Sequence, residues 1–137
     1  VLKKYSQVGS LKNISQAYAQ SLSKVTGAMV CVADRDEIIA AAGKNHKNYI
    51  GKALSKELEN IMDKRKSALY SKKDDTLIPV VKDDKVDCEA QAIAVIVHDG
   101  DSAGAVILCV YGEKADKSEI AEKLAGAAAE FLADQLG

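Results

Sequence analysis

Apolar residues are concentrated in four short runs that lie between an amphipathic segment near each end of the chain. The runs are Ala28–Ala33, Ile38–Ala42, Ala92–Val97 and Ala103–Tyr111. Each run is apolar at consecutive positions, which predicts strands buried on both faces. The sequence therefore predicts a sheet that is covered on both sides.

Three stretches have the three-to-four-residue apolar spacing of amphipathic helices. The first spans residues 10–26 and ends at Gly27, which suits the left-handed position after a helix. The second is predicted over Ser55–Tyr70, with its first residue as the cap. The third lies at the C-terminal end and carries Ile120, Leu124, Ala128, Phe131 and Leu132.

Two further segments complete the predicted fold. Residues 1–9 are predicted to be an extended segment that leads into the first helix. Leu77–Val81 is predicted to be a short strand at the edge of the sheet, because Pro79 has no N–H to donate to a neighbouring strand. The fold class is α+β, with a five- to six-stranded antiparallel sheet. The N- and C-terminal helices would cover one face, and the Ser55–Tyr70 helix with its loops would cover the other.

Composition allows a single domain and points to no charged partner. The chain has 137 residues, of which 47% are hydrophobic, and its formal net charge is −1. This balance gives no electrostatic reason to expect nucleic acid or membrane binding by the segment itself. No apolar run approaches the roughly 18–20 residues that a membrane span needs. Because the chain starts at Val1, we expect it to be a piece of a longer protein.

The cysteines and histidines do not form a catalytic or metal-binding pattern. Cys31, Cys88 and Cys109 are odd in number, far apart and without a C-x-x-C spacing, which favours a reducing, cytoplasmic compartment. His46 and His98 stand in polar loops without metal-ligand spacing. We therefore predict no catalytic residue, no metal site and no cofactor.

The apolar stripes of the two end helices allow two interpretations. They suit a core within one chain, and they are also wide enough to face a second chain along a coiled-coil-like seam. We predict a homodimer, since cyclic dimers are the commonest assemblies. The predicted interface consists of Leu11, Ile14, Tyr18, Leu22, Leu124, Ala128 and Phe131.

Several segments, in this order and spacing, resemble the C-terminal regulatory region of the stage V sporulation protein T family, a group of AbrB-like transcription regulators. The similarity covers nearly the whole chain, from Val1 to Gln135. The segments are Val1–Ser6, Cys31–Asp36, Tyr49–Ser55, Ala103–Ile107 and Ala127–Ala133.

The resemblance implies a GAF-type regulatory domain over residues 10–137, preceded at residues 1–9 by a linker from a missing N-terminal DNA-binding domain. It implies dimerisation through the end helices, or a tetramer in the full-length protein, and a small-molecule effector that tunes DNA binding by an activator or repressor. DNA would be contacted only through the missing domain. Because GAF folds serve many functions, the fold alone does not identify a ligand.

An effector would lie between the sheet and the Ser55–Tyr70 helix, fenced by loops 44–50 and 71–90. Two alternatives remain open: a pure interaction module of the profilin or roadblock kind, and a cysteine-based methionine sulfoxide reductase of the GAF type. The residues of the predicted pocket, which would equally suit a plain core, are Val30, Val32, Ile61, Ile78, Val80, Ile93 and Val95.

Overall fold

The computed structural model describes residues 2–112 and 116–136, with side chains from residue 11 to 112 and from 118 to 136. Helices and strands follow one another along the chain as predicted in outline. They are α1 (Leu2–Thr26), β1 (Met29–Ala33), β2 (Ile38–Ala42), the 3-10 turn η1 (His46–Asn48), α2 (Lys56–Lys64), β3 (Ala68–Ser71), β4 (Ala90–His98), β5 (Asp101–Val110) and α3 (Asp116–Leu136).

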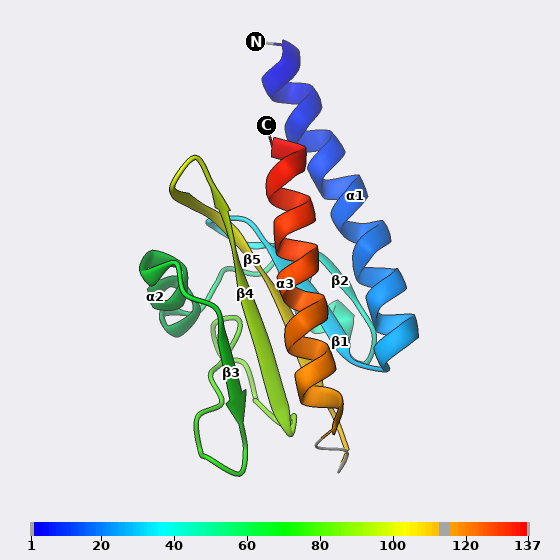
Figure 1. Ribbon diagram of the computed structural model, residues 1–137, viewed down its shortest axis with the longest axis vertical. Helices are drawn as coiled ribbons and strands as arrows, with labels where there is room; N and C mark the ends of the chain where they lie inside the picture. Colours follow the sequence, from blue (N-terminus) through cyan, green and yellow to red (C-terminus); the bar gives the residue numbers. More distant parts are fainter. Residues whose placement is uncertain (1, 113–115, 137) are drawn as a thin grey trace.

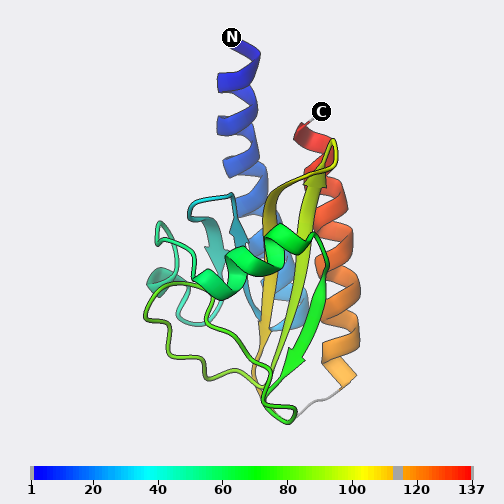
Figure 2. The same ribbon diagram turned by 90° about the vertical axis from the view of Figure 1, so that its left-hand side faces the viewer.

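The strands form one antiparallel sheet in the order β2-β1-β5-β4-β3. Helices α1 and α3 cover one face (Figure 1). Helix α2 and the long loops cover the other face, as the view turned by 90° shows (Figure 2). The predicted α+β architecture is therefore confirmed.

The face under α1 and α3 is packed closely because α3 meets the sheet with small side chains. Ala121, Ala125, Ala128 and Ala129 are all at most 4% exposed, and they lie over branched residues of the central strands. Alanine lets a helix approach a sheet closely, so this layer is thin and well filled. We call it the helix face.

The opposite face has larger side chains in its core. Leu58, Ile61 and Met62 of α2 pack with residues of β1, β4 and β5, together with Leu54 and Val80 from the loops. We call it the loop face, because α2 is its only helix longer than one turn within the described residues. Loops therefore supply much of its cover.

Two glutamine side chains pair with backbone groups that have no strand neighbour. On edge strand β2, Ala41 exchanges hydrogen bonds of 3.0 and 3.2 Å with the Gln16 amide of α1. In β4, the buried Gln91 side-chain amide accepts from Ile78 N at 2.9 Å and donates to Ile78 O at 2.7 Å, and Ile78 belongs to an irregular segment. These pairs satisfy polar groups whose burial alone would cost free energy.

Two predicted helix boundaries are wrong, the start of the first helix and the end of the second. The lead over residues 1–9 is not extended where the chain is described, since α1 is already helical from Leu2. The second helix stops at Lys64 instead of Tyr70, because Arg65 takes the left-handed conformation with φ 56°. The residues after it form β3, which pairs with β4 and is the edge strand on that side of the sheet.

The edge strand predicted over Leu77–Val81 is likewise absent. The segment is irregular and makes a single isolated bridge, from Val81 to Leu54. Pro79 lacks an N–H, and the Gln91 side chain occupies the place of a strand partner at Ile78. The end of this irregular segment, at Val81, borders a hollow on the loop face.

Helices α1 and α3 lie antiparallel, with both chain ends at one end of the molecule (Figures 1 and 2). The first turns of α1 project beyond the sheet in both views. Among residues 2–112 and 116–136, no helix combines the length and apolar character that a bilayer crossing requires.

Candidate functional site

The loops of the loop face are tied to each other at several points. Bridges join Glu37 to Ala53 and Leu54 to Val81. Ser55 caps α2 by accepting from Leu58 N at 3.1 Å, and its own N–H donates to Val80 O at 3.1 Å. Two chain segments, 44–54 and 80–88, are thereby held beside one another at the start of α2.

A hollow of about 530 Å³ opens between these two segments. We call it the loop hollow. Its wall contains donors and acceptors of both charges, with three lysines and three aspartates. The lining residues are Asn45, Asn48, Tyr49, Lys52, Ala53, Val81, Lys82, Asp83, Asp84, Lys85 and Asp87.

The Tyr49–Asp84 pair anchors the floor of the loop hollow. Tyr49 is 7% exposed, and its hydroxyl donates to Asp84 Oδ1 at 2.8 Å. The other Asp84 oxygen accepts from Val80 N at 2.9 Å. Burial, and then the hydrogen bond to Asp84, raises the pKa of the Tyr49 phenol. The pair therefore holds both segments in place as a neutral phenol and a carboxylate.

A second aromatic side chain borders this region. The Lys44 Nζ atom lies 4.8 Å from the ring centroid of Tyr111, close enough for a cation–π contact. Burial, and then the neighbouring thiol of Cys109, raises the pKa of the Tyr111 phenol. Both tyrosines are therefore uncharged hydrogen-bonding groups at neutral pH.

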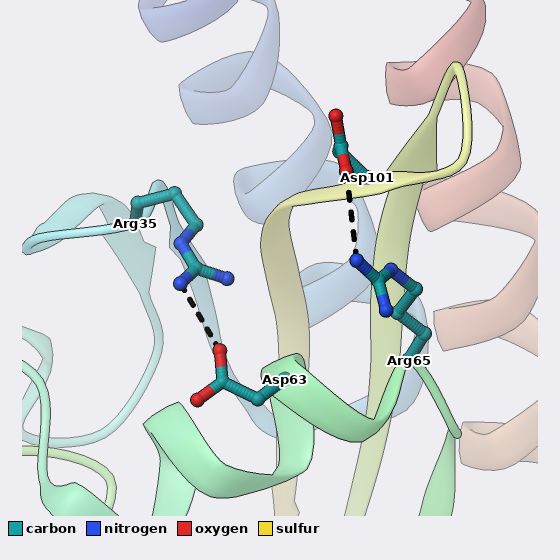
Figure 3. A network of polar contacts seen from close by, with 4 residues as sticks. All are labelled: Arg35, Asp63, Arg65 and Asp101. Atoms are coloured by element: carbon teal, nitrogen blue, oxygen red, sulfur yellow. Dashed lines mark hydrogen bonds and ion pairs between the residues drawn. The ribbon is translucent and has the colours of Figure 1, made fainter.

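Helix α2 is attached at its C-terminal end by two exposed ion pairs (Figure 3). Asp63 accepts from Arg35, in the β1–β2 turn, at 3.1 Å. Arg65 reaches Asp101, at the start of β5, at 3.5 Å. All four side chains are about half exposed or more, so these pairs orient α2 with little net stabilisation.

The predicted pocket does not exist as an open space among the residues named for it. Ile61, Val80, Ile93 and Val95 are buried in the loop-face core, with Ile78 packed against it. Val30 and Val32 face the other way, into the helix-face core, because side chains alternate along a strand. The loop hollow lies nearer the protein surface, between the segments that the prediction treated as a fence.

The predicted dimer interface divides into three groups. Leu22 and Ala128 are buried in the chain's own core, so they have no surface for a partner. Leu11, Ile14, Tyr18 and Leu124 are partly buried against the same core. Phe131 is 39% exposed, and its ring lies 5.1 Å from that of Tyr18.

The predicted site residues do not include Tyr49 and Asp84 on the loop face, or Val25 and Ile120, which were expected only as apolar positions of the end helices. Tyr49 and Asp84 carried no signal beyond an aromatic and an acid in polar loops, 35 positions apart. Val25 and Ile120 are exposed by 79% and 54% on the outer sides of α1 and α3. Their exposure could have been anticipated from helical spacing only if the face toward the sheet had been known.

The histidines have local partners. His46 Nδ1 lies 2.9 Å from Gly43 O, and His98 Nε2 lies 3.3 Å from Asp99 Oδ2. In the described part of the chain, no three His, Cys, Asp or Glu side chains gather as a metal site would require. The arrangement of the loop face suits binding through hydrogen bonds and charge.

Comparison with known proteins gives a consistent picture. Residues 10–137 match the family described as stage V sporulation protein T C-terminal, transcription factor. Stage V sporulation protein T of Bacillus subtilis (strain 168) is 35% identical over 136 residues, which is 99% of this chain and 74% of that protein.

Solved structures of low identity that are similar to this chain include several GAF domains and an enzyme. The GAF domain of an Acinetobacter phosphoenolpyruvate-protein phosphotransferase has 7% identity and a TM-score of 0.66, over 92% of this chain and 81% of that one. The cofactor-binding GAF domain of the nutrient sensor CodY from Clostridium difficile has 15% identity and a TM-score of 0.53, over 96% of this chain and 96% of that one. A type II free methionine-R-sulfoxide reductase from Thermoplasma acidophilum has 15% identity and a TM-score of 0.67, over 92% of this chain and 94% of that one. These matches show the GAF fold.

Proposed function

Because this chain belongs to the family of stage V sporulation protein T C-terminal transcription-factor domains, we propose that it is a non-catalytic regulatory domain that binds a small polar effector in the loop hollow and pairs with a second copy through α1 and α3. The observation that carries the effector half is the loop hollow itself, set between two irregular segments on one face of a GAF fold. The regulatory role follows from the family.

The size and lining of the loop hollow support a small ligand. Its volume of about 530 Å³ falls within the roughly 300–1,000 Å³ of typical ligand sites. Lys52, Lys82 and Lys85 can donate to an anionic group, while Asp83 and Asp87 can accept from a cationic one. We infer a zwitterionic or mixed-charge metabolite of low molecular weight, because side chains of both charges line the loop hollow and could each meet a ligand group of the opposite sign.

A structural relative is in keeping with this proposal. The similar GAF domain of CodY is described as cofactor-binding and as part of a nutrient sensor. At 15% identity its ligand does not transfer to this chain, but a GAF fold that holds a ligand in a regulator is the same kind of arrangement.

The outer sides of α1 and α3 support the pairing half. We call Val25, Ile120, Ala127 and Phe131 the outer stripe, since all four are exposed while the inward side chains of both helices are buried. The contact between Tyr18 and Phe131 sets the two antiparallel helices level at that point. Seven residues after Tyr18 and seven residues before Phe131, Val25 of α1 comes level with Leu124 of α3. An exposed apolar band across both helices suits a second copy of the chain.

Effector binding and pairing would be coupled if the effector binds two arrangements of the dimer with unequal affinity. A ligand shifts a dimer only if it binds one arrangement better than another. The strands β1, β4 and β5 contribute side chains to both faces, so a change on the loop face reaches the helices through one layer. DNA would be contacted by a part of the regulator outside this domain.

The effector half is tested by a thermal-shift screen with amino acids, nucleotides and organic acids. Some members of the panel should raise Tm by several degrees, since binding to the folded state stabilises it. Asn48→Trp should abolish the rise because it fills the loop hollow, whereas Asn60→Trp on the exposed side of α2 should retain it. A panel without effect on the wild-type chain contradicts this half.

The pairing half is tested by sedimentation of Ile120→Asp. The wild type should sediment as a dimer and the variant as a folded monomer, because an aspartate in the outer stripe would be buried without a partner. Asn60→Asp is the control, since it adds the same charge at an exposed position of α2, on the opposite face of the sheet from α1 and α3. A wild-type monomer, or an Ile120→Asp dimer, contradicts it.

A further inference from the structure

All three thiols of the chain meet on the loop face although they are far apart in sequence. Cys31 comes from β1, Cys109 from β5, and Cys88 from the segment that leads into β4. Each is buried, and all three belong to one cluster of core side chains. Met29 adds a fourth sulfur, since it stands directly opposite Cys109 in the β1–β5 register.

Within this cluster, Cys88 and Cys109 form a pair. Glu89 N donates to Val110 O at 2.8 Å, which brings the chain beside Cys88 against the chain beside Cys109. The two thiols interact through a hydrogen bond that lowers the pKa of Cys88 and raises that of Cys109. Cys31 is engaged elsewhere, because its Sγ lies 3.2 Å from Met29 Sδ.

The unequal environments give the two thiols different chemical roles. Cys88 is the easier thiol to ionise, and the thiolate is the nucleophilic form. Cys109 keeps its proton, because burial adds to the effect of Cys88 on its pKa. Burial likewise raises the pKa of the Cys31 thiol. Redox-sensing cysteines often pair an easily ionised attacking thiol with a resolving thiol, and since Cys88 is buried, its reaction requires opening of the segment that carries it.

We propose that Cys88 and Cys109 are an oxidative modification site that closes to a reversible disulfide when the domain meets a hydroperoxide. The Cys88 thiolate attacks the distal peroxide oxygen, the O–O bond breaks, and the leaving alkoxide or hydroxide takes a proton to become an alcohol or water. The Cys109 sulfur then attacks the Cys88 sulfenic acid, its proton leaves with the hydroxyl as water, and the S–S bond forms. In sum, two thiols are oxidised and one hydroperoxide is reduced.

The site is placed where such a bond would change the loop hollow. Asp87 lines the loop hollow and directly precedes Cys88. The segment from Lys82 to Glu89 has no helix or strand, so local opening can admit a small oxidant to the buried thiol. A bond from Cys88 to β5 would fix this wall to the sheet. Disulfides inside cells are usually transient and redox-sensing, which fits a reversible bond here.

The test treats the purified chain with hydrogen peroxide, unfolds it in denaturant with an alkylating reagent that blocks every remaining free thiol, and maps the peptides by mass spectrometry. Two of the three thiols should become unreactive, with a Cys88–Cys109 linked peptide that dithiothreitol removes. No effector is present, so this result is independent of the effector proposal.

Single-cysteine variants separate the roles. Cys31→Ala is the matched control and should form the linked peptide as the wild type does. Cys88→Ala should form none, and Cys109→Ala should trap a sulfenic acid on Cys88 that a cyclic diketone probe labels. If all three thiols of the treated wild type stay reduced, or if the disulfide forms through Cys31, the proposal is overturned. This outcome does not depend on whether the Cys109 variant folds.

Discussion

The two faces of one sheet differ in almost every physical respect. The helix face is closed by α3 through four buried alanines, whereas the loop face is built from Leu58, Ile61 and Met62 and from irregular chain. The tyrosine, aspartate and thiol side chains that interact with one another gather on the loop face. One layer therefore joins a tightly packed support to an adjustable surface, a division that suits a regulatory domain.

The largest expected effect comes from emptying the loop-face core. Leu58→Ala removes a side chain that is 0% exposed, and should lower the free energy of unfolding by about 2–5 kcal/mol in urea denaturation. Leu69→Ala in β3, where the side chain is 39% exposed, serves as the control and should cost much less. Equal losses would mean that α2 is not packed on the sheet as described.

The helix face should respond in the opposite way, since it is sensitive to added volume. Ala128→Leu should cost roughly 1–3 kcal/mol, because Ala128 is 0% exposed and the added atoms must displace the sheet or α3. Ala17→Leu places the same atoms at an exposed position of α1, outside the outer stripe, and should cost within about 0.5 kcal/mol. Tolerance of Ala128→Leu would contradict the closed packing of this face.

The loop face should also be sensitive to alkaline pH. The pKa of Tyr49 is raised in the folded state, so folding favours the protonated phenol. The stabilisation is complete below the unfolded-state pKa of about 10 and is lost as the pH rises beyond it. Tyr49→Phe should make the decline between pH 10 and 11 shallower by up to about 1.4 kcal/mol per pH unit, measured by urea denaturation. An unchanged decline would show that the phenol is not buried as described.

The smallest effect is expected at the ion pairs of α2. A double-mutant cycle on Arg35 and Asp63 should give a coupling of about 0.2–1 kcal/mol, because both side chains are at least 49% exposed. The coupling should shrink in high salt, since exposed charges are screened. A coupling that is larger and independent of salt would indicate a buried pair, and hence a more rigid attachment of α2.

The sheet and the two end helices could be predicted from the sequence because their patterns are strong and local. Residues 38–42 are apolar at every position, and β2 covers Ile38–Ala42 as expected. Helix α2 and β3 were merged, since nothing in the sequence marks Arg65 as the residue that turns left-handed. Leu77–Val81 looked like a strand, and a single distant side chain, Gln91, provides the pairing that a strand would have made.

The candidate site was harder to predict than the fold because long-range contacts create it. Tyr49 meets Asp84, and Cys88 meets Cys109, only after the loops have folded over the sheet. The choice of Val30 and Val32 as pocket walls failed for a simple reason. Both faces of β1 are apolar, so the pattern cannot say which side chains point toward α2.

Hydrogen exchange, followed by mass spectrometry with and without a mixture of free amino acids, nucleotides and organic acids, tests the division between the faces most directly. Without the mixture, segments 44–54 and 76–89 should exchange faster than β4, β5 and α3. With it, the same two segments should gain protection. Exchange that the mixture leaves unchanged everywhere, or alters only in α1 and α3, would contradict an effector site on the loop face.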